Sequence, residues 1–165
     1  MKSITYLFLT SLIIASLSAC GFHLRGASDI QFKSVFIQGN TLTISKDLKK
    51  YLTLNDIQIL PTAEKAELLL ELVGEENEKR ILSLAGDGTV NEYELYYRVS
   101  YRSKLINQPL WSEVSTIESR RAFSYSNATL LSKQTEENKL NEGMQKDAVN
   151  RLVRRLSALK KQTNK

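Results

Sequence analysis

Few residues in this sequence could carry out covalent or metal chemistry. The 165-residue chain has one cysteine, Cys20, and one histidine, His23, both near the N-terminus. Ser/His/Asp catalysis and zinc sites with several histidines are therefore implausible. A pair of carboxylates, as in glycoside hydrolysis, stays open because the chain has 18 acidic residues. We predict a protein that is not an enzyme and holds no metal or other cofactor, with a carboxylate enzyme as the alternative.

Cys20 follows an apolar leader. Lys2 supplies a positive start, and residues 4–16 are rich in Leu and Ile, which is typical of a secretory signal peptide. The apolar run is shorter than the roughly 20 residues that cross a membrane, and it ends at small residues, which favours cleavage. A retained signal anchor and a secreted protein with a free thiol are the alternatives. A single cysteine has no disulfide partner in its own chain, so a covalent modification is the better explanation.

The residues around this cysteine are Leu17-Ser18-Ala19-Cys20-Gly21. They resemble the lipobox of bacterial lipoproteins, which implies that residues 1–19 are cleaved as a signal peptide. The resemblance also implies a diacylglyceryl group on the Cys20 sulfur and a further acyl chain, such as palmitate, on its amino group. Each buried methylene contributes about 0.8 kcal/mol, so these chains would hold the protein at a membrane. Gly21 after the cysteine resembles lipoproteins that are exported to the outer membrane.

The length of the mature chain predicts one domain. Removing residues 1–19 from the 165 leaves 146, enough for a single core. We expect a lipidated tether over residues 20–32, one α+β domain over 33–161 and a polar tail over 162–165. Because Lys2 is the only charge in the leader, the mature chain carries 22 basic and 18 acidic side chains, a net charge of +4. The basic residues gather in the second half, and phosphorylated lipids are better candidate partners than nucleic acid for an exported protein.

Short apolar runs and one amphipathic stretch make up the first half of the domain. Residues 34–38 predict a buried strand, closed by a turn at Gly39 and Asn40. Ser45 is expected to cap a helix that ends near Asn55, and residues 57–60 are expected to be extended. The runs at 68–73 and 81–85 are predicted strands, separated by a charged hairpin-like or bulged stretch.

Alternation is clearest over residues 93–101, which follow a predicted turn at Gly86-Asp87-Gly88. Apolar or aromatic side chains occupy every second position, which predicts a strand with one face inward. A turn at 107–109 leads to a predicted antiparallel partner over 110–123. From about residue 127 the apolar spacing becomes helical, with possible breaks at residues 134–138 and at Gly143.

Together these elements predict an α+β two-layer sandwich, in which two helices pack on one face of a four-stranded, mainly antiparallel sheet. The opposite face of the sheet is expected to be exposed and to carry Glu92, Glu94, Tyr96, Arg98 and Arg102. The tyrosines and arginines could bind a sugar phosphate, but the inward tyrosines are more often core residues. The basic residues at the end of the chain could also bind an anion, but a solvated helix face with favourable C-terminal charge explains them equally well. They are Arg151, Arg154, Arg155, Lys160 and Lys161.

Three stretches of the mature chain resemble the LptE family of lipopolysaccharide-assembly lipoproteins. They are Cys20-Gly21-Phe22-His23-Leu24-Arg25-Gly26 at the start, Asn91-Glu92-Tyr93-Glu94-Leu95 after the central turn, and Leu131-Ser132-Lys133-Gln134-Thr135-Glu136-Glu137 before the last helix. The order of the predicted elements is also that of the family. The resemblance implies a two-helix, four-strand sandwich that sits as a 1:1 plug inside the large outer-membrane β-barrel LptD.

The resemblance also implies candidate ligand-binding residues. In the family, a basic residue at the position of Lys133 is implicated in lipopolysaccharide binding, together with a basic residue in the loop between the second and third strands. At that loop position this sequence has Gly86, and the nearest cations are Lys79 and Arg80. Lys133, Lys79 and Arg80 are therefore the candidates. An ammonium group can pair with a phosphate of lipid A or of the core, and a barrel lumen would strengthen the pairing.

We therefore predict an outer-membrane lipoprotein, anchored through Cys20. Its domain would lie on the periplasmic side and within the barrel lumen, where it would help to assemble the barrel and contact lipopolysaccharide in transit. A polar sheet face suits the polar interior of such a barrel. The alternatives are a free-standing periplasmic lipoprotein enzyme acting on envelope glycans and an accessory lipoprotein of another envelope assembly machine.

Overall fold

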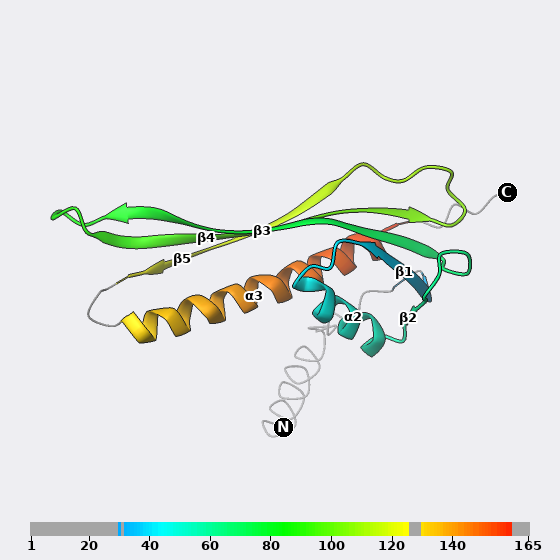
Figure 1. The fold of residues 1–165 in the computed structure, drawn as a ribbon, viewed down its shortest axis with the longest axis horizontal. Helices are drawn as coiled ribbons and strands as arrows, with labels where there is room; N and C mark the ends of the chain where they lie inside the picture. Colours follow the sequence, from blue (N-terminus) through cyan, green and yellow to red (C-terminus); the bar gives the residue numbers. More distant parts are fainter. Residues whose placement is uncertain (1–29, 31, 126–129, 160–165) are drawn as a thin grey trace, which may run out of the picture.

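The computed structural model describes residues 30, 32–125 and 130–159. Cys20, the leader and nearly all of the expected tether lie outside the described residues. In the described part, two helices lie on one side of a five-stranded sheet (Figure 1). The predicted α+β sandwich with two helices on one face is confirmed.

The sheet is mixed, in the order β2-β1-β3-β4-β5. Its strands are β1 (Ser34–Gly39), β2 (Gln58–Ile59), β3 (Leu68–Leu84), β4 (Val90–Leu105) and β5 (Ser115–Ser124). β1 runs parallel to both of its neighbours, and β3, β4 and β5 are antiparallel. The prediction of four mainly antiparallel strands was therefore wrong in detail. The fifth strand, β2, is two residues long and is held by backbone bonds from Gln58 to Lys33 and from Leu60 to Val35, each 2.9 Å.

β3 is longer than its sequence pattern predicted. The charged stretch between the two expected strands does not turn back, and the chain continues as one 17-residue strand. Its pairing with β4 shifts register between Leu72 and Gly74 and twice between Ile81 and Leu84. Because β4 supplies hydrogen-bond partners along this whole length, polar residues 75–80 can stay extended. The predicted Gly86-Asp87-Gly88 turn is confirmed: Gly88 has a φ of +83°, and the hairpin closes with a 2.8 Å bond from the Ala85 N–H to the Thr89 carbonyl.

β4 confirms the period-two prediction. Leu95, Tyr97, Val99 and Tyr101 are buried and belong to the core. Burial raises the pKa of Tyr97, and its hydroxyl donates a hydrogen bond to Glu75 on β3. The predicted partner strand begins later than expected: residues 110–114 are irregular, and the Ser112 N–H bonds to the Ser103 carbonyl at 2.8 Å outside the ladder.

The first helix, α2 (Ile44–Leu54), ends next to Asn55, near the predicted end, but it starts before Ser45, so the prediction that Ser45 caps it was wrong. Ser45 lies inside the first turn, where its hydroxyl accepts a 3.0 Å hydrogen bond from the Leu42 N–H. Thr43 precedes the helix and donates its N–H to Glu75 at 2.6 Å. This bond joins the start of α2 to β3.

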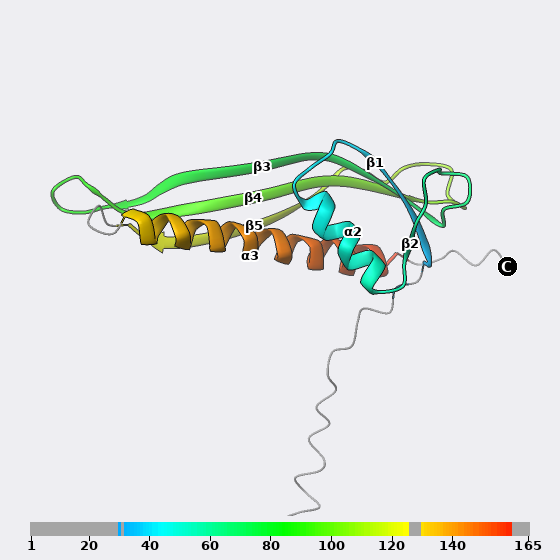
Figure 2. The same cartoon turned by 60° about the horizontal axis from the view of Figure 1, so that its bottom comes forward.

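The second helix, α3 (Leu130–Ser157), is continuous over 28 residues, so neither expected break occurs. A glycine inside a helix costs about 1 kcal/mol relative to alanine, which is less than the burial of Met144, Leu152 and Leu156 on the same helix contributes. α3 runs along the length of the sheet, whereas α2 lies next to α3 at the end of the sheet that carries β1 and β2 (Figure 2). The core fills the space between these helices and the sheet.

Gly39 ends β1 in a conformation that demands glycine. Its φ is +96°, and a Cβ atom at this position would lie 2.3 Å from the Leu72 carbonyl oxygen. That carbonyl also accepts a 2.9 Å hydrogen bond from the Asn40 N–H. The turn and the neighbouring strand therefore leave no room for a side chain.

The edge strand β5 is bonded by arginine side chains. Guanidinium groups donate to three carbonyls on alternate residues: Arg155 to Thr116 at 3.1 Å, Arg151 to Glu118 at 2.9 Å, and Arg121 to Arg120 at 2.8 Å. Two of these arginines come from α3, where the sequence predicted a solvated basic face. Arg151 and Arg155 are exposed, as predicted, but they also fasten the helix to the sheet edge.

Candidate functional site

Lys79 lies on β3 and points to the helix side of the sheet. Its Nζ is 2.6 Å from Glu137 on α3. The same ammonium lies 4.3 Å from the centre of the Tyr93 ring, with the rings of Phe123 and Tyr125 at 5.5 and 5.9 Å. Aromatic faces attract cations, so this lysine is held by three rings and one carboxylate.

Lys133 lies on the first turns of α3. Its Nζ donates to the Ser124 hydroxyl at 3.1 Å and lies 2.8 Å from Glu136. The side chain is only 18% exposed, because the end of β5 covers it. Lys133 is thus placed in a defined position instead of extending freely into solvent.

The structure brings these two lysines to the same region, which we call the lysine cluster and define as Lys79, Lys133, Glu136 and Glu137. Both lysines contact the last residues of β5 or those just after it, and their carboxylate partners are neighbours on α3. The lysine cluster pairs two positive groups with two negative ones. A phosphate group carries a charge of about −1.5 to −2 and three acceptor oxygens, so it could replace a carboxylate as the partner of a lysine here.

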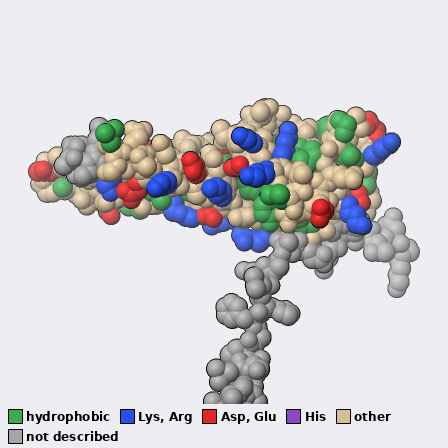
Figure 3. All heavy atoms as spheres, turned by 90° about the horizontal axis from the view of Figure 1, so that it is seen from below, with side chains coloured by type: hydrophobic (Ala, Val, Ile, Leu, Met, Phe, Trp, Pro, Cys, Tyr) green, Lys and Arg blue, Asp and Glu red, His purple; other side chains and the backbone are tan. Residues whose placement is uncertain are grey.

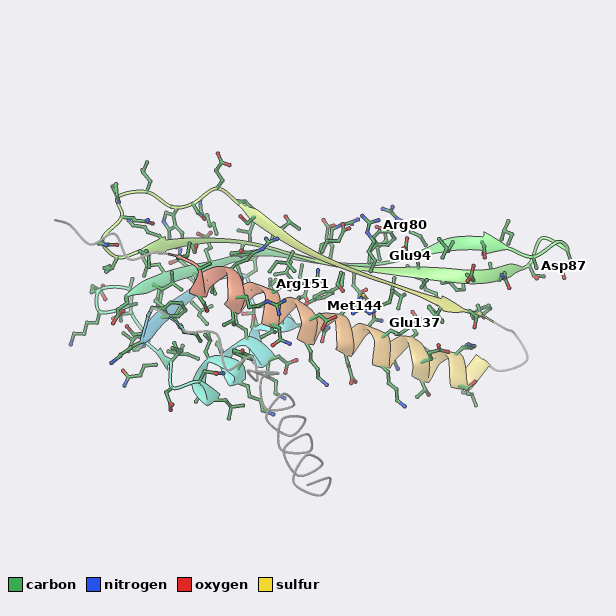
Figure 4. All side chains as sticks on the ribbon, turned by 180° about the vertical axis from the view of Figure 1, so that it is seen from behind. Arg80, Asp87, Glu94, Glu137, Met144 and Arg151 are labelled. Atoms are coloured by element: carbon green, nitrogen blue, oxygen red, sulfur yellow. The ribbon has the colours of Figure 1, made fainter. Side chains whose placement is uncertain are left out.

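Arg80 does not join the lysine cluster. Successive residues of a strand point to opposite faces, and Arg80 follows Lys79 directly. Its guanidinium lies on the open face of the sheet, 2.6 Å from Glu78 and 4.6 Å from the centre of the Tyr96 ring. Figure 4 shows Arg80 and Glu94 on the side of the sheet away from α3, and Glu137 on the helix. The three candidate residues therefore lie at two separate sites, on opposite faces of the sheet.

On the open face, three arginines surround one tyrosine. The guanidinium carbons of Arg98 and Arg120 lie 5.1 and 5.0 Å from the centre of the Tyr96 ring, in addition to that of Arg80. They leave Tyr96 only 9% exposed, although it lies on the face expected to be solvated. The sequence pattern placed Tyr96 and Arg98 on this face. It did not predict the cluster, because the contact with Arg80 and Arg120 depends on the register of β3 and β5 against β4.

Carboxylates balance the positive charge of this cluster. Glu118 accepts hydrogen bonds from Arg98 at 2.6 Å and from Arg120 at 2.5 Å, and these bonds hold the pKa of its carboxyl below the ordinary value of 4.5. The hydrogen bond from Arg80 likewise lowers the pKa of Glu78. The open face is thus a network of ion pairs with its charges largely matched.

This network predicts a loss of stability in acid. Because the pKa of Glu118 is lower in the folded than in the unfolded state, its contribution is complete above the unfolded value of 4.5 and disappears as the pH falls through the folded value. We expect the urea concentration at the unfolding midpoint to decrease as the pH is lowered from neutrality to about 3. Glu118→Gln should make this decrease smaller. Glu113→Gln is the matched control, since Glu113 is exposed and has no ion-pair partner among the described residues. An equal pH dependence in both variants would contradict the prediction.

Two further searches covered the described residues. They contain no group of three His, Cys, Asp or Glu side chains placed to hold a metal ion. No helix among residues 30, 32–125 and 130–159 is long and apolar enough to cross a membrane.

The geometry defines a class of protein: an α+β two-layer sandwich with ordered ion pairs on both faces of its sheet. Comparison with known proteins gives the family. The sequence profile of the LptE family, described as lipopolysaccharide-assembly, matches residues 32–156. The chain belongs to the LptE family.

Individual relatives agree with this membership. The LPS-assembly lipoprotein LptE of Photorhabdus laumondii is 26% identical over 152 residues, which cover 90% of this chain and 82% of the relative. Lipoprotein B from Nitrosomonas europaea, a solution NMR structure, is 36% identical and superposes with a TM-score of 0.72, covering 84% of this chain and 91% of that one. The rare lipoprotein B from Shewanella oneidensis is 25% identical, with a TM-score of 0.69 and coverage of 76% and 94%.

Proposed function

We propose that this protein is an outer-membrane lipoprotein that plugs and helps to assemble an LptD-like β-barrel and binds lipopolysaccharide during its transfer to the outer leaflet. Membership of the LptE family, whose profile covers residues 32–156, is the observation that carries this proposal. The relative from Photorhabdus laumondii is named for lipopolysaccharide assembly. Acylation of Cys20 supplies the anchor on the periplasmic side.

The end of the hairpin supports contact with another protein. Three large apolar side chains, Ile81, Leu82 and Leu84, are between 48% and 59% exposed near the tip of the β3–β4 hairpin. Figure 4 shows this tip, marked by Asp87, extending beyond the start of α3. Large apolar side chains exposed this close together in the chain favour an interaction site, so we assign the hairpin end to the barrel interface.

Three glutamates of the sheet are poor candidates for the acid of a glycosidase acting on envelope glycans. A glycosidase needs a carboxylic acid whose pKa is raised so that it can donate a proton. Arginines act in the opposite direction on Glu71, Glu78 and Glu118, and lower the pKa of each. These carboxylates are therefore suited to hold cations.

The direct test is to isolate the complex. Outer membranes solubilised in mild detergent and passed over a column that binds a C-terminal tag should release this protein together with one large β-barrel in about equal amount. Recovery of the lipoprotein alone, folded and monomeric, would contradict the plug and favour the enzyme. Recovery with a different set of envelope proteins would favour an accessory role in another assembly machine.

Lys133→Glu should weaken lipopolysaccharide binding by roughly tenfold to a hundredfold, the range expected when a charged hydrogen-bond partner is removed. The variant places a negative group where Lys133 contacts Ser124 and Glu136 in the lysine cluster. Binding would be measured with purified lipopolysaccharide and the soluble domain. Lys139→Glu is the control, because Lys139 is exposed on the same helix and has no ion-pair partner among the described residues. Equal losses in both variants would indicate a general charge effect and reject Lys133 as a specific contact.

A further inference from the structure

A positively charged surface lies apart from the lysine cluster. We call it the basic helix face and define it by five exposed cations on α2 and on the C-terminal half of α3: Lys46, Lys49, Lys50, Lys146 and Arg154. Figure 3 looks onto the helix side of the molecule and shows Lys and Arg side chains gathered over it. Within the described residues, none of these five has an ion-pair partner.

Few acidic groups offset this charge. Asp47 lies among the lysines of α2, and Glu142 lies one turn before Lys146. Asp147 is already paired with Arg121 on β5. The guanidinium groups that bond the edge carbonyls of β5 add further positive charge from the same half of α3.

Charge is therefore unequal along the helix layer. The first half of α3 carries two lysines and three glutamates, namely Lys133, Lys139, Glu136, Glu137 and Glu142. The second half and α2 carry an excess of unpaired cations. Unpaired cations on one face attract an anionic partner, whereas the matched ion pairs of the open sheet face do not.

A groove between the two helices adds an apolar component. Its volume is about 280 Å³, and it is lined by two cations, one carboxylate and four other side chains, namely Lys50, Lys146, Asp47, Tyr51, Leu54, Val149 and Asn150. Leu54 is 73% exposed. Two ammonium groups beside an exposed leucine and a tyrosine suit a molecule with an anionic head and an apolar body, such as a phospholipid at the surface of a bilayer.

The length of the tether keeps a bilayer within reach of this face. Ten residues lead from Cys20 to Ile30, the first described residue, which packs against the core. A fully extended chain spans at most about 3.6 Å per residue, so the attachment point lies within roughly 36 Å of the acylated cysteine.

We infer that the basic helix face rests on the anionic phospholipid headgroups of the leaflet that holds the acyl chains of Cys20. This inference rests on the proposed lipid anchor and adds a site to it. Lys50 and Lys146 bind headgroup phosphates at the mouth of the groove, and Leu54 lies at the level of the first acyl carbons. The face then cannot also lie against a barrel wall, so the hairpin end of the domain is the part that enters the barrel.

Flotation with lipid vesicles tests this without the anchor or the barrel. The mature chain carrying Cys20→Ser, which cannot be acylated, should float with vesicles of phosphatidylcholine and phosphatidylglycerol but not with phosphatidylcholine alone. A combined Lys49→Gln, Lys50→Gln and Lys146→Gln variant should bind about 100-fold more weakly, since each cation near an anionic surface contributes about fivefold. The matched control, Lys65→Gln, Lys104→Gln and Lys139→Gln, loses the same charge elsewhere and should bind as the parent does. Circular dichroism establishes that both variants are folded.

Three results would overturn the inference. The first is a failure of the parent chain to float with anionic vesicles. The second is equal weakening in both triple variants, which would indicate net charge and not this surface. The third is normal flotation of the Lys49/Lys50/Lys146 variant with loss of the co-purifying barrel, which would assign the face to a protein. Failure of the barrel isolation itself would leave the vesicle result intact, so the two proposals are tested separately.

Discussion

Gly39→Ala is expected to lower the free energy of unfolding by about 3 kcal/mol or more, because it combines backbone strain with a collision. The φ of +96° at this residue is rarely adopted by residues with a side chain, and the new Cβ would lie 2.3 Å from the Leu72 carbonyl oxygen. Relief requires β1 to move away from β3, and the 2.9 Å bond from the Asn40 N–H to the same carbonyl opposes that movement.

Urea denaturation followed by circular dichroism would measure this effect, with Gly143→Ala as the control. Gly143 lies inside α3, and a Cβ there would meet nothing within 4 Å. Alanine is the better helix former, so this variant should gain about 0.5–1 kcal/mol. If the two glycine-to-alanine variants change the free energy of unfolding in opposite directions, the position of the glycine, and not the residue type, is the cause. An unchanged stability in Gly39→Ala would mean that the end of β1 relaxes freely.

Leu152→Ala should cost about 3 kcal/mol, within the range of 2–5 observed for buried leucines. Leu152 is completely buried, on the part of α3 that packs against the sheet. Its truncation removes apolar contacts and leaves a cavity that the helix cannot fill without leaving the carbonyls of β5 bonded to Arg151 and Arg155. Stability would again be measured by urea denaturation.

Leu131→Ala is the control for this prediction. Leu131 lies on the same helix but is 86% exposed, so its truncation should change stability by no more than about 0.5 kcal/mol. If both leucine variants lost the same stability, the effect would come from helix propensity and not from the core.

The parts of the fold that sequence predicted well were those with a regular apolar period. Residues 93–101 alternate strictly, and β4 buries the expected side chains apart from Tyr93, which is half-buried. The prediction failed where stability comes from a distant partner. β3 looked interrupted because residues 75–80 are polar, yet the opposite strand keeps them extended. Likewise, β2 consists of two residues, which is too few for any periodic signal.

The candidate site shows the same limit. The resemblance to the family identified Lys133, and proximity along the chain suggested Lys79 and Arg80. Alternation along β3 then separates the last two onto opposite faces of the sheet. Alternation was available in the sequence, but the expected bulged stretch over residues 75–80 obscured it. The arginines around Tyr96 come from three strands, so only the register of the sheet brings them together.

The arginines that bond the carbonyls of β5 have a consequence for what this strand edge can pair with. An open strand edge is a template on which another chain can add a strand, by β-augmentation or by aggregation. With Thr116, Glu118 and Arg120 already bonded to guanidinium groups, this stretch of the edge offers fewer free acceptors. In the complex that we propose, β5 would therefore contact a barrel through its side chains, and would not add a strand to the barrel wall.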